Sequence, residues 1–121
     1  MAVQQPPTAL TVTIADGAAI SGAFDLTDFI GGIVIIPDSW TDANMGFKVC
    51  ETQTGTFVIL RDNTGVPVQI SGIITNAANA YKIPDDIFPA RWVKLWSKNT
   101  TAATVTDNNQ TGAISPVVML K

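Results

Sequence analysis

Short extended segments separated by turn residues constrain this chain more than any other sequence feature. Residues 10–14 alternate apolar and β-branched polar side chains, which is typical of a half-buried strand. Asp16-Gly17 then supplies a turn. No long stretch repeats its apolar residues with the period of about 3.6 that an amphipathic helix needs. The sequence therefore predicts an all-β fold.

The same reading predicts about eight to ten short strands along the chain. Gly and Asp-Asn turns close most of these segments, a pattern typical of an antiparallel β-sandwich or jelly roll. A connection over 38–46, with room for one helical turn, is anchored by Trp40, and 84–89 is a rigid crossing segment. Further strands are expected at 19–26, 31–36, 47–51, 56–61, 66–70, 80–83, 91–98 and 116–120.

The chain length of 121 residues predicts a single domain, which we place at residues 9–121. Residues 1–8 are expected to form an extended N-terminal arm, because Pro6 and Pro7 favour polyproline geometry. Val3, Gln4 and Gln5 complete the arm and give it little to bury in a core. We therefore predict that residues 3–7 become ordered on a partner.

Histidine is absent, which removes most common reaction centres. Ser-His-Asp and Cys-His systems, His-based zinc sites and histidine general bases all require that residue. The single cysteine, Cys50, cannot form an internal disulfide or a thiolate cluster, and its strand-like surroundings favour a packing role. The sequence predicts no catalytic, cofactor-binding or metal-binding residue, so the chain is not expected to be an enzyme.

Carboxylates offer no alternative centre, because they occur almost entirely beside turn-forming residues, where they cap backbone groups. These are Asp38, Asp42, Glu51, Asp62, Asp85, Asp86 and Asp107. The oxygen-rich runs 42–46 and 107–112 resemble calcium loops in composition, but neither completes the loop with a terminal glutamate. Surface turns explain both runs.

Charge and hydropathy favour an assembly protein over a nucleic-acid or membrane protein. Charged residues make up 14% of the chain, against about 25% in typical domains, and the net charge is −3. A neutral surface costs less to dehydrate against a partner. Nucleic acid is not expected as a partner, since basic residues are dense only over 91–98. The apolar run 29–37 is too short to span a bilayer, and the absence of a signal-like N-terminus predicts cytoplasmic synthesis.

The strand expected at 91–98 carries the most informative side chains. Trp92, Lys94 and Trp96 share one face, and Val93 and Leu95 share the other. Either Val93 and Leu95 enter the core, leaving two tryptophans outside to be covered by a partner, loop or ligand, or the tryptophans themselves are buried. The sequence leaves both assignments open.

Four groups of residues carry a resemblance to known proteins: Ile30–Thr41, Phe47–Val49, Gly55–Phe57 leading to Asp62 and Gly65, and Pro89–Ser97. Together they resemble small virion proteins of tailed bacteriophages, the structural, decoration or cement proteins. The order of a strand, a tryptophan-bearing connection, a hairpin and an Ala-Arg-aromatic strand is also similar to reduced discoidin-type β-sandwiches.

The phage resemblance implies a β-sandwich that binds the outside of an expanded capsid and bridges neighbouring major capsid subunits. It also implies a homo-oligomer, with a trimer favoured over a dimer. On this hypothesis the partner is the major capsid protein, the location is the capsid exterior, and the interface includes residues 3–7, Trp92, Lys94 and Trp96. The discoidin similarity implies an alternative, carbohydrate binding or adhesion, with Trp40, Trp92 or Trp96 stacking on the ligand.

Overall fold

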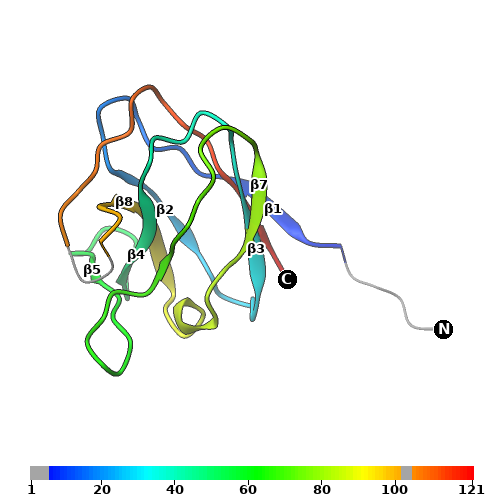
Figure 1. Ribbon diagram of the computed structural model, residues 1–121. Coiled ribbons are helices and arrows are strands. Elements are labelled where there is room, and N and C mark those ends of the chain that lie inside the picture. The colour runs from blue at the N-terminus through cyan, green and yellow to red at the C-terminus, as the bar shows by residue number, and fades with distance from the viewer. Residues whose placement is uncertain (1–5, 102–104) are drawn as a thin grey trace.

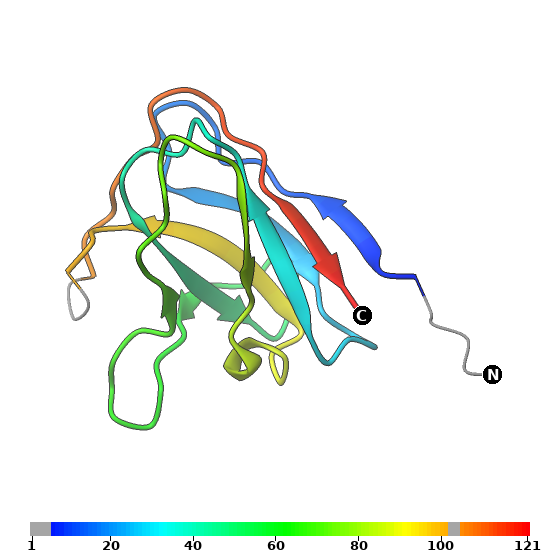
Figure 2. The same ribbon diagram turned by 45° about the vertical axis from the view of Figure 1, so that its right-hand side comes forward.

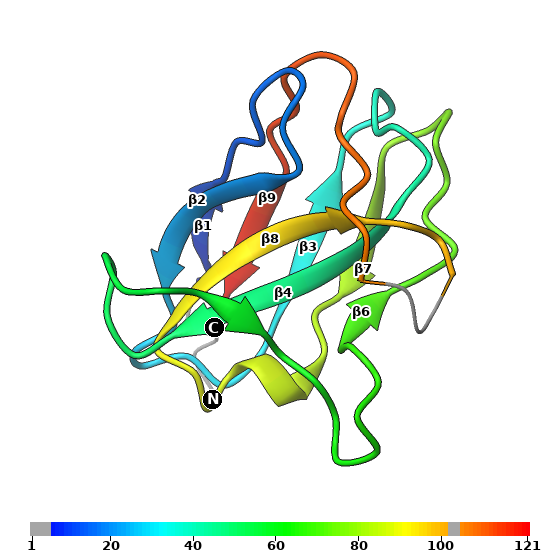
Figure 3. The same ribbon diagram turned by 90° about the vertical axis from the view of Figure 1, so that its left-hand side faces the viewer.

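The fold is two antiparallel β-sheets packed face to face. It was obtained as a computed structural model, which describes residues 6–101 and 105–121. Figure 1 shows the two layers, and Figure 3 shows β2, β8 and β4 in front of β1, β9 and β3. The predicted all-β sandwich is confirmed.

Each sheet combines strands that are distant in the sequence. The four-stranded sheet has the order β1 (Thr8–Thr11), β9 (Val117–Leu120), β3 (Gly32–Ile36) and β7 (Asn79–Lys82). The five-stranded sheet contains β2 (Ile20–Asp25), β8 (Trp92–Lys98), β4 (Asn44–Cys50) and β5 (Val58–Ile59), with β6 (Gln69–Ile70) also paired to β4. A short 3₁₀ turn, η1 (Asp85–Ile87), connects β7 to β8.

The core lies between the sheets and follows from the alternation of side chains along each strand. The four-stranded sheet contributes Val34, Ile36, Val118 and Leu120, and the five-stranded sheet contributes Phe24, Met45, Phe47, Val93 and Leu95. These side chains are all nearly inaccessible to solvent. Fully burying one large aliphatic or aromatic side chain contributes about 1.5–3 kcal/mol, so this layer is the main source of stability.

A buried glutamine ties the loops together at one end of the sandwich. Gln110 is 1% exposed, and its Oε1 accepts a hydrogen bond of 2.8 Å from the Thr41 N–H. Its Nε2 donates to the Ser97 hydroxyl at 2.9 Å, and its own N–H donates to the Ala18 carbonyl. One residue, through its side chain and its main-chain N–H, thereby holds three segments that are far apart in the sequence.

Strand positions agree with the sequence-based predictions to within one residue at β2, β3, β7, β8 and β9, and they differ most in the middle of the chain. The segments expected at 56–61 and 66–70 form paired strands only at Val58–Ile59 and Gln69–Ile70. Between them the Asp62 side chain accepts hydrogen bonds from Thr64 and closes a turn. β1 begins at Thr8, whose register partner is Leu120, so the last residue of the expected arm lies in the sheet.

Candidate functional site: the outer faces of the sandwich

The position of β8 shows which face of this strand enters the core, a question that the sequence left open. Val93 and Leu95 point into the core and are 0% and 1% exposed, so Trp92, Lys94 and Trp96 lie on the outer face of the five-stranded sheet. Although both tryptophans lie on the outer face, they are not both accessible to solvent. Trp92 is half-buried, whereas Trp96 is completely buried.

Residues from two other segments, β4 and the loop after β8, cover Trp96. Gly46 is its register partner on β4 and leaves room for the indole, and the Lys48 Nζ lies 5.1 Å from the ring centroid. The indole Nε1 donates to the Asp107 carboxylate at 2.7 Å, which fixes the loop after β8 beside the ring. Trp96 is therefore unavailable as a docking or stacking residue, and its predicted roles in the interface and in ligand binding are wrong.

Trp40 anchors the connection before β4, as predicted, but it cannot bind a ligand. Its side chain is 2% exposed and belongs to the core, and its Nε1 donates to the Ala43 carbonyl at 3.0 Å. The predicted stacking role of Trp40 is therefore also wrong. Of the three candidate stacking residues, Trp92 alone keeps an accessible ring.

The outer face around Trp92 combines aromatic rings with positive charge. Lys48 and Lys94 are register partners on β4 and β8, and Lys94 Nζ lies 4.5 Å from the Phe57 ring centroid. Within residues 6–101 and 105–121 neither lysine forms a salt bridge. The guanidinium of Arg91 lies 5.8 Å from the Trp92 ring. Two like charges directly opposite one another destabilise a sheet slightly, so the face favours an anionic neighbour.

Asp25 places a negative charge beside Arg91. Hydrogen bonds from the Thr27 hydroxyl and N–H, together with the charge of Arg91 at 3.8 Å, hold the pKa of Asp25 below its ordinary value. The carboxylate is therefore ionised at neutral pH and closes one end of the basic stretch.

Lys98 ends β8 and is not part of an accessible basic surface. It is 0% exposed, and its Nζ donates to Gln69 Oε1 at 2.7 Å and to the Asn99 and Thr101 carbonyls, both at 3.0 Å. Burial lowers the pKa of its ammonium group. Its role is structural, because it links β8 to β6 and to the following loop.

The outer face of the four-stranded sheet is apolar. Ile33 and Met119 are register partners, as are Ile35 and Val117, and all four side chains point away from the core. Ile33 is 39% exposed, and Ile30, in the loop before β3, is 87% exposed. Ala9 and Ala80 continue the two rows, and a depression of about 460 Å³ lies against Pro7, Ile33, Met119, Lys82 and Lys121. Antiparallel sheets normally expose polar residues on a solvated face.

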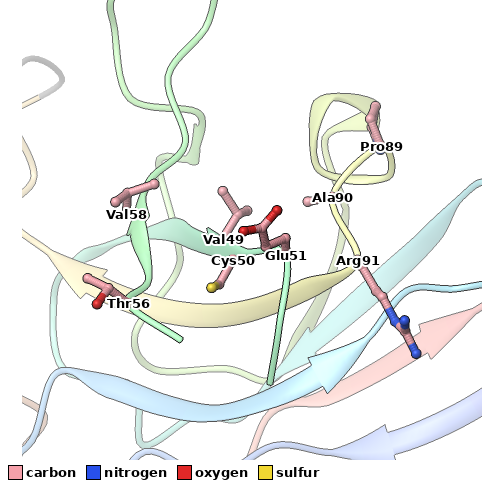
Figure 4. Close-up of a pocket in the computed structure, with 8 residues that line it drawn as sticks. All are labelled: Val49, Cys50, Glu51, Thr56, Val58, Pro89, Ala90 and Arg91. Atoms are coloured by element: carbon pink, nitrogen blue, oxygen red, sulfur yellow. The ribbon is translucent and has the colours of Figure 1, made fainter. Parts of the chain in front are cut away.

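An open pocket of about 500 Å³ lies where β4, β5 and the segment before β8 meet. Figure 4 shows the Cys50 sulfur and the Glu51 carboxylate pointing in different directions, with Arg91 turned away from both. The Cys50 thiol approaches the Thr52 hydroxyl at 3.8 Å. This geometry places no general base beside the thiol, so the pocket contains no activated nucleophile of the usual kind.

The remaining predicted site residues are in the N-terminal arm. Val3, Gln4 and Gln5 lie outside the described residues. Pro6 and Pro7 are exposed and lead directly into β1. Among the described residues, no three Cys, Asp or Glu side chains come together in a way that could hold a metal ion. Over the same residues, no helix is long and apolar enough to cross a membrane.

Comparisons with known proteins identify no relative of this chain. No protein-family model, no curated protein and no solved structure matches it. The function must therefore be argued from the fold class, a two-sheet antiparallel β-sandwich, and from its two unlike outer faces.

Proposed function

We propose that this chain is a non-enzymatic structural protein of a tailed-phage particle, a capsid decoration or cement protein. It binds the capsid exterior and bridges neighbouring major capsid subunits, after synthesis in the host cytoplasm. The observation that carries the proposal is the apolar outer face formed by Ile33, Ile35, Val117 and Met119. The sequence resemblance to small virion proteins supports the choice of partner.

The apolar face supports protein binding because its outward side chains are apolar and few of them are charged. Removing apolar surface from water contributes about 25 cal/mol for each Å² buried. The face carries two cations at its border, Lys82 and Lys121. Charged residues make up 14% of the chain, which lowers the cost of dehydrating the rest of the surface against a partner. Many copies on one particle add their contacts, because opening the shell requires all of them to break.

The strand order supports the same class of protein. With β5 set aside, the sheets read β1-β9-β3-β7 and β2-β8-β4-β6. This order supports the jelly-roll form of the sandwich, which is part of the proposal. Viral capsid domains and lectins both use this architecture. The fold alone therefore leaves two functions open, and the outer faces favour assembly.

The proposed contact surface differs from the one expected from sequence alone. It retains residues 3–7 of the arm together with Trp92 and Lys94, omits Trp96 because that residue is buried, and adds the apolar face. The arm precedes β1, which borders the apolar face, so arm and face can reach the same partner. Self-association remains part of the proposal.

The test is co-sedimentation with expanded, undecorated capsids of the phage that encodes the chain. We expect the wild-type protein to pellet with the capsids at a fixed ratio to the major capsid protein. Ile33→Lys places a charge in the apolar face and should abolish pelleting. Val58→Lys is the matched control, since Val58 is 59% exposed but lies on β5 of the other sheet.

Two results would contradict the proposal. Wild-type protein that stays in the supernatant would remove the capsid as partner. Equal pelleting of both variants would remove the apolar face as the contact surface.

Carbohydrate binding remains the alternative, and half-buried Trp92 beside Lys94 is the observation that favours it. It predicts saturable glycan binding that Trp92→Ala abolishes, with a change in tryptophan fluorescence. A glycan array with wild-type protein tests it directly.

A further inference from the structure

β1 forms one edge of the four-stranded sheet, and no other strand of the described residues pairs with its outer side. It pairs with β9 on one side, and the strand order places it at the end of the sheet, as Figure 2 also shows. Val12 and Ile14 continue the line of β1 and donate their N–H groups to Pro116 and Ile114 at 2.9 and 2.8 Å. Because hydrogen-bonding direction alternates along a strand, the N–H and C=O groups of Ala9, Thr11 and Thr13 point to the free side.

The other sheet edges carry the features that normally prevent strand pairing. β2 has a register shift between Ile20 and Ala23, and β5 contains two residues. β7 carries Lys82, and the N–H of Ile74 donates to the Tyr81 hydroxyl beside it. β1, in contrast, reads Thr-Ala-Leu-Thr, without charge, proline or bulge.

An apolar groove runs along the same edge. It has a volume of about 540 Å³ and lies between β1 and β2, so that a strand added to β1 would cover its opening. Apolar side chains from both sheets line it, and Leu10 and Phe29 among them are half-buried. An added strand therefore gains main-chain hydrogen bonds at the edge and apolar contacts over the groove.

We infer that β1 pairs with β1 of a second copy of this chain, antiparallel about a twofold axis, to make one continuous sheet across a dimer. With Thr11 on the axis, Thr11 lies opposite itself and Ala9 lies opposite the second copy's Thr13. Each such pair exchanges both main-chain hydrogen bonds. Leu10 and Val12 of the two copies then lie across from each other over the groove openings.

A second copy fits this edge better than an unrelated strand, because the edge is complementary to itself. Its residues are neutral, so the twofold axis brings no like charges together. Both hydrogen-bond donors and acceptors alternate with the same spacing on each copy. The Thr11 side chains meet on the outer face, where paired threonines stabilise a sheet. Pairing would also join the apolar faces of the two copies side by side.

The first test measures mass by light scattering over a concentration series of the purified protein. We expect the mass to rise from 12.8 kDa to twice that value. Thr11→Pro removes an N–H that faces away from β9, so it should keep the fold and leave a monomer at every concentration. Thr11→Val keeps the N–H and should still give the dimer.

A second test depends less on the tolerance for proline. In a Cys50→Ser background, Thr11→Cys places two thiols across the axis at a Cα separation of about 5.5 Å, within the range of roughly 4.4–6.8 Å for a disulfide. We expect oxidation to give a covalent dimer. Thr13→Cys is the matched control and should not cross-link to itself, because its partner is Ala9.

The two tests overturn the inference in separate ways. A wild-type protein that remains at 12.8 kDa at all concentrations contradicts self-pairing. Equal cross-linking through Thr11→Cys and Thr13→Cys contradicts the register. Neither result bears on capsid binding, which is measured with particles present.

Discussion

A single methyl group added at Gly46 should destabilise this sandwich, although alanine usually improves a strand. Replacing glycine by alanine within a strand or helix is normally favourable by about 0.5–1 kcal/mol. At Gly46, however, the new Cβ would lie 2.6 Å from Trp96 Cε3 and 3.2 Å from Lys98 Cδ. Real side chains essentially never approach so closely, so Trp96 has to move.

The surroundings of Gly46 resist that movement. The Trp96 indole is fixed by its hydrogen bond to Asp107, and Lys98 by its hydrogen bonds to Gln69 and two carbonyls. Overpacking a rigid site costs about 1–3 kcal/mol, and the normal benefit of alanine offsets part of that cost. We therefore expect Gly46→Ala to lower the free energy of unfolding by about 1–2 kcal/mol.

Urea unfolding followed by circular dichroism measures this loss. With an m-value of about 2 kcal/mol per M, the midpoint should fall by roughly 0.5–1 M. Gly22→Ala is the matched control, because nothing lies within 4 Å of a Cβ added at Gly22, and its midpoint should stay or rise. In a Trp96→Leu background, Gly46→Ala should cost much less, since the clashing ring is gone.

Two outcomes would refute this reasoning. Gly46→Ala could prove as stable as wild type, which would mean that the sheet adapts without strain. Alternatively, its cost could be unchanged in the Trp96→Leu background, which would place the strain elsewhere.

Three further predictions follow from buried and hydrogen-bonded polar groups. Gln110→Ala leaves the Thr41 N–H without this partner and removes the hydrogen bond that the Ser97 hydroxyl accepts, and urea unfolding should show a loss of about 2–3 kcal/mol. Hydrogen bonds from Thr64 lower the pKa of Asp62, so carboxyl NMR should give a midpoint below 3.8, and the stabilisation of this turn should disappear as the pH falls through that midpoint. Burial lowers the pKa of Lys98 from 10.5, so the folded state binds fewer protons than the unfolded state between the lowered value and 10.5. The free energy of unfolding should rise with pH through that window, and Lys98→Met should remove the rise.

The fold class could be predicted because it depends on local signals. Alternation within 91–98 and the short apolar run at 117–120 identify strands, and turn residues such as Asp62 and Gly65 separate the neighbouring ones. Gly65 has a φ of 85°, a conformation that glycine adopts without strain. Strand identity and turn chemistry therefore need no knowledge of the partner strands.

The burial of Trp96 could not be predicted, because its cover comes from distant parts of the chain. Asp107 reaches it from the next loop, and Lys48 and Gly46 reach it from β4. One signal was present in the sequence: a glycine immediately before the strand-like run 47–51 can mark close approach of another group. The sequence pattern places Gly46 in the preceding connection, and therefore does not predict that it lies opposite the indole.

The two outer faces differ because only one of them has a cover among the described residues. On the five-stranded sheet the loop after β8 closes over Trp96, so the chain itself protects its largest outward side chain. On the four-stranded sheet the outward residues Ile33 and Met119 keep their apolar surface at the solvent boundary. The sequence carried this signal too, since β3 is apolar at inward and outward positions alike. A strand apolar on both faces is stable when both faces are covered. We propose that the second cover for β3 comes from another molecule, which is the physical basis for placing assembly on this face.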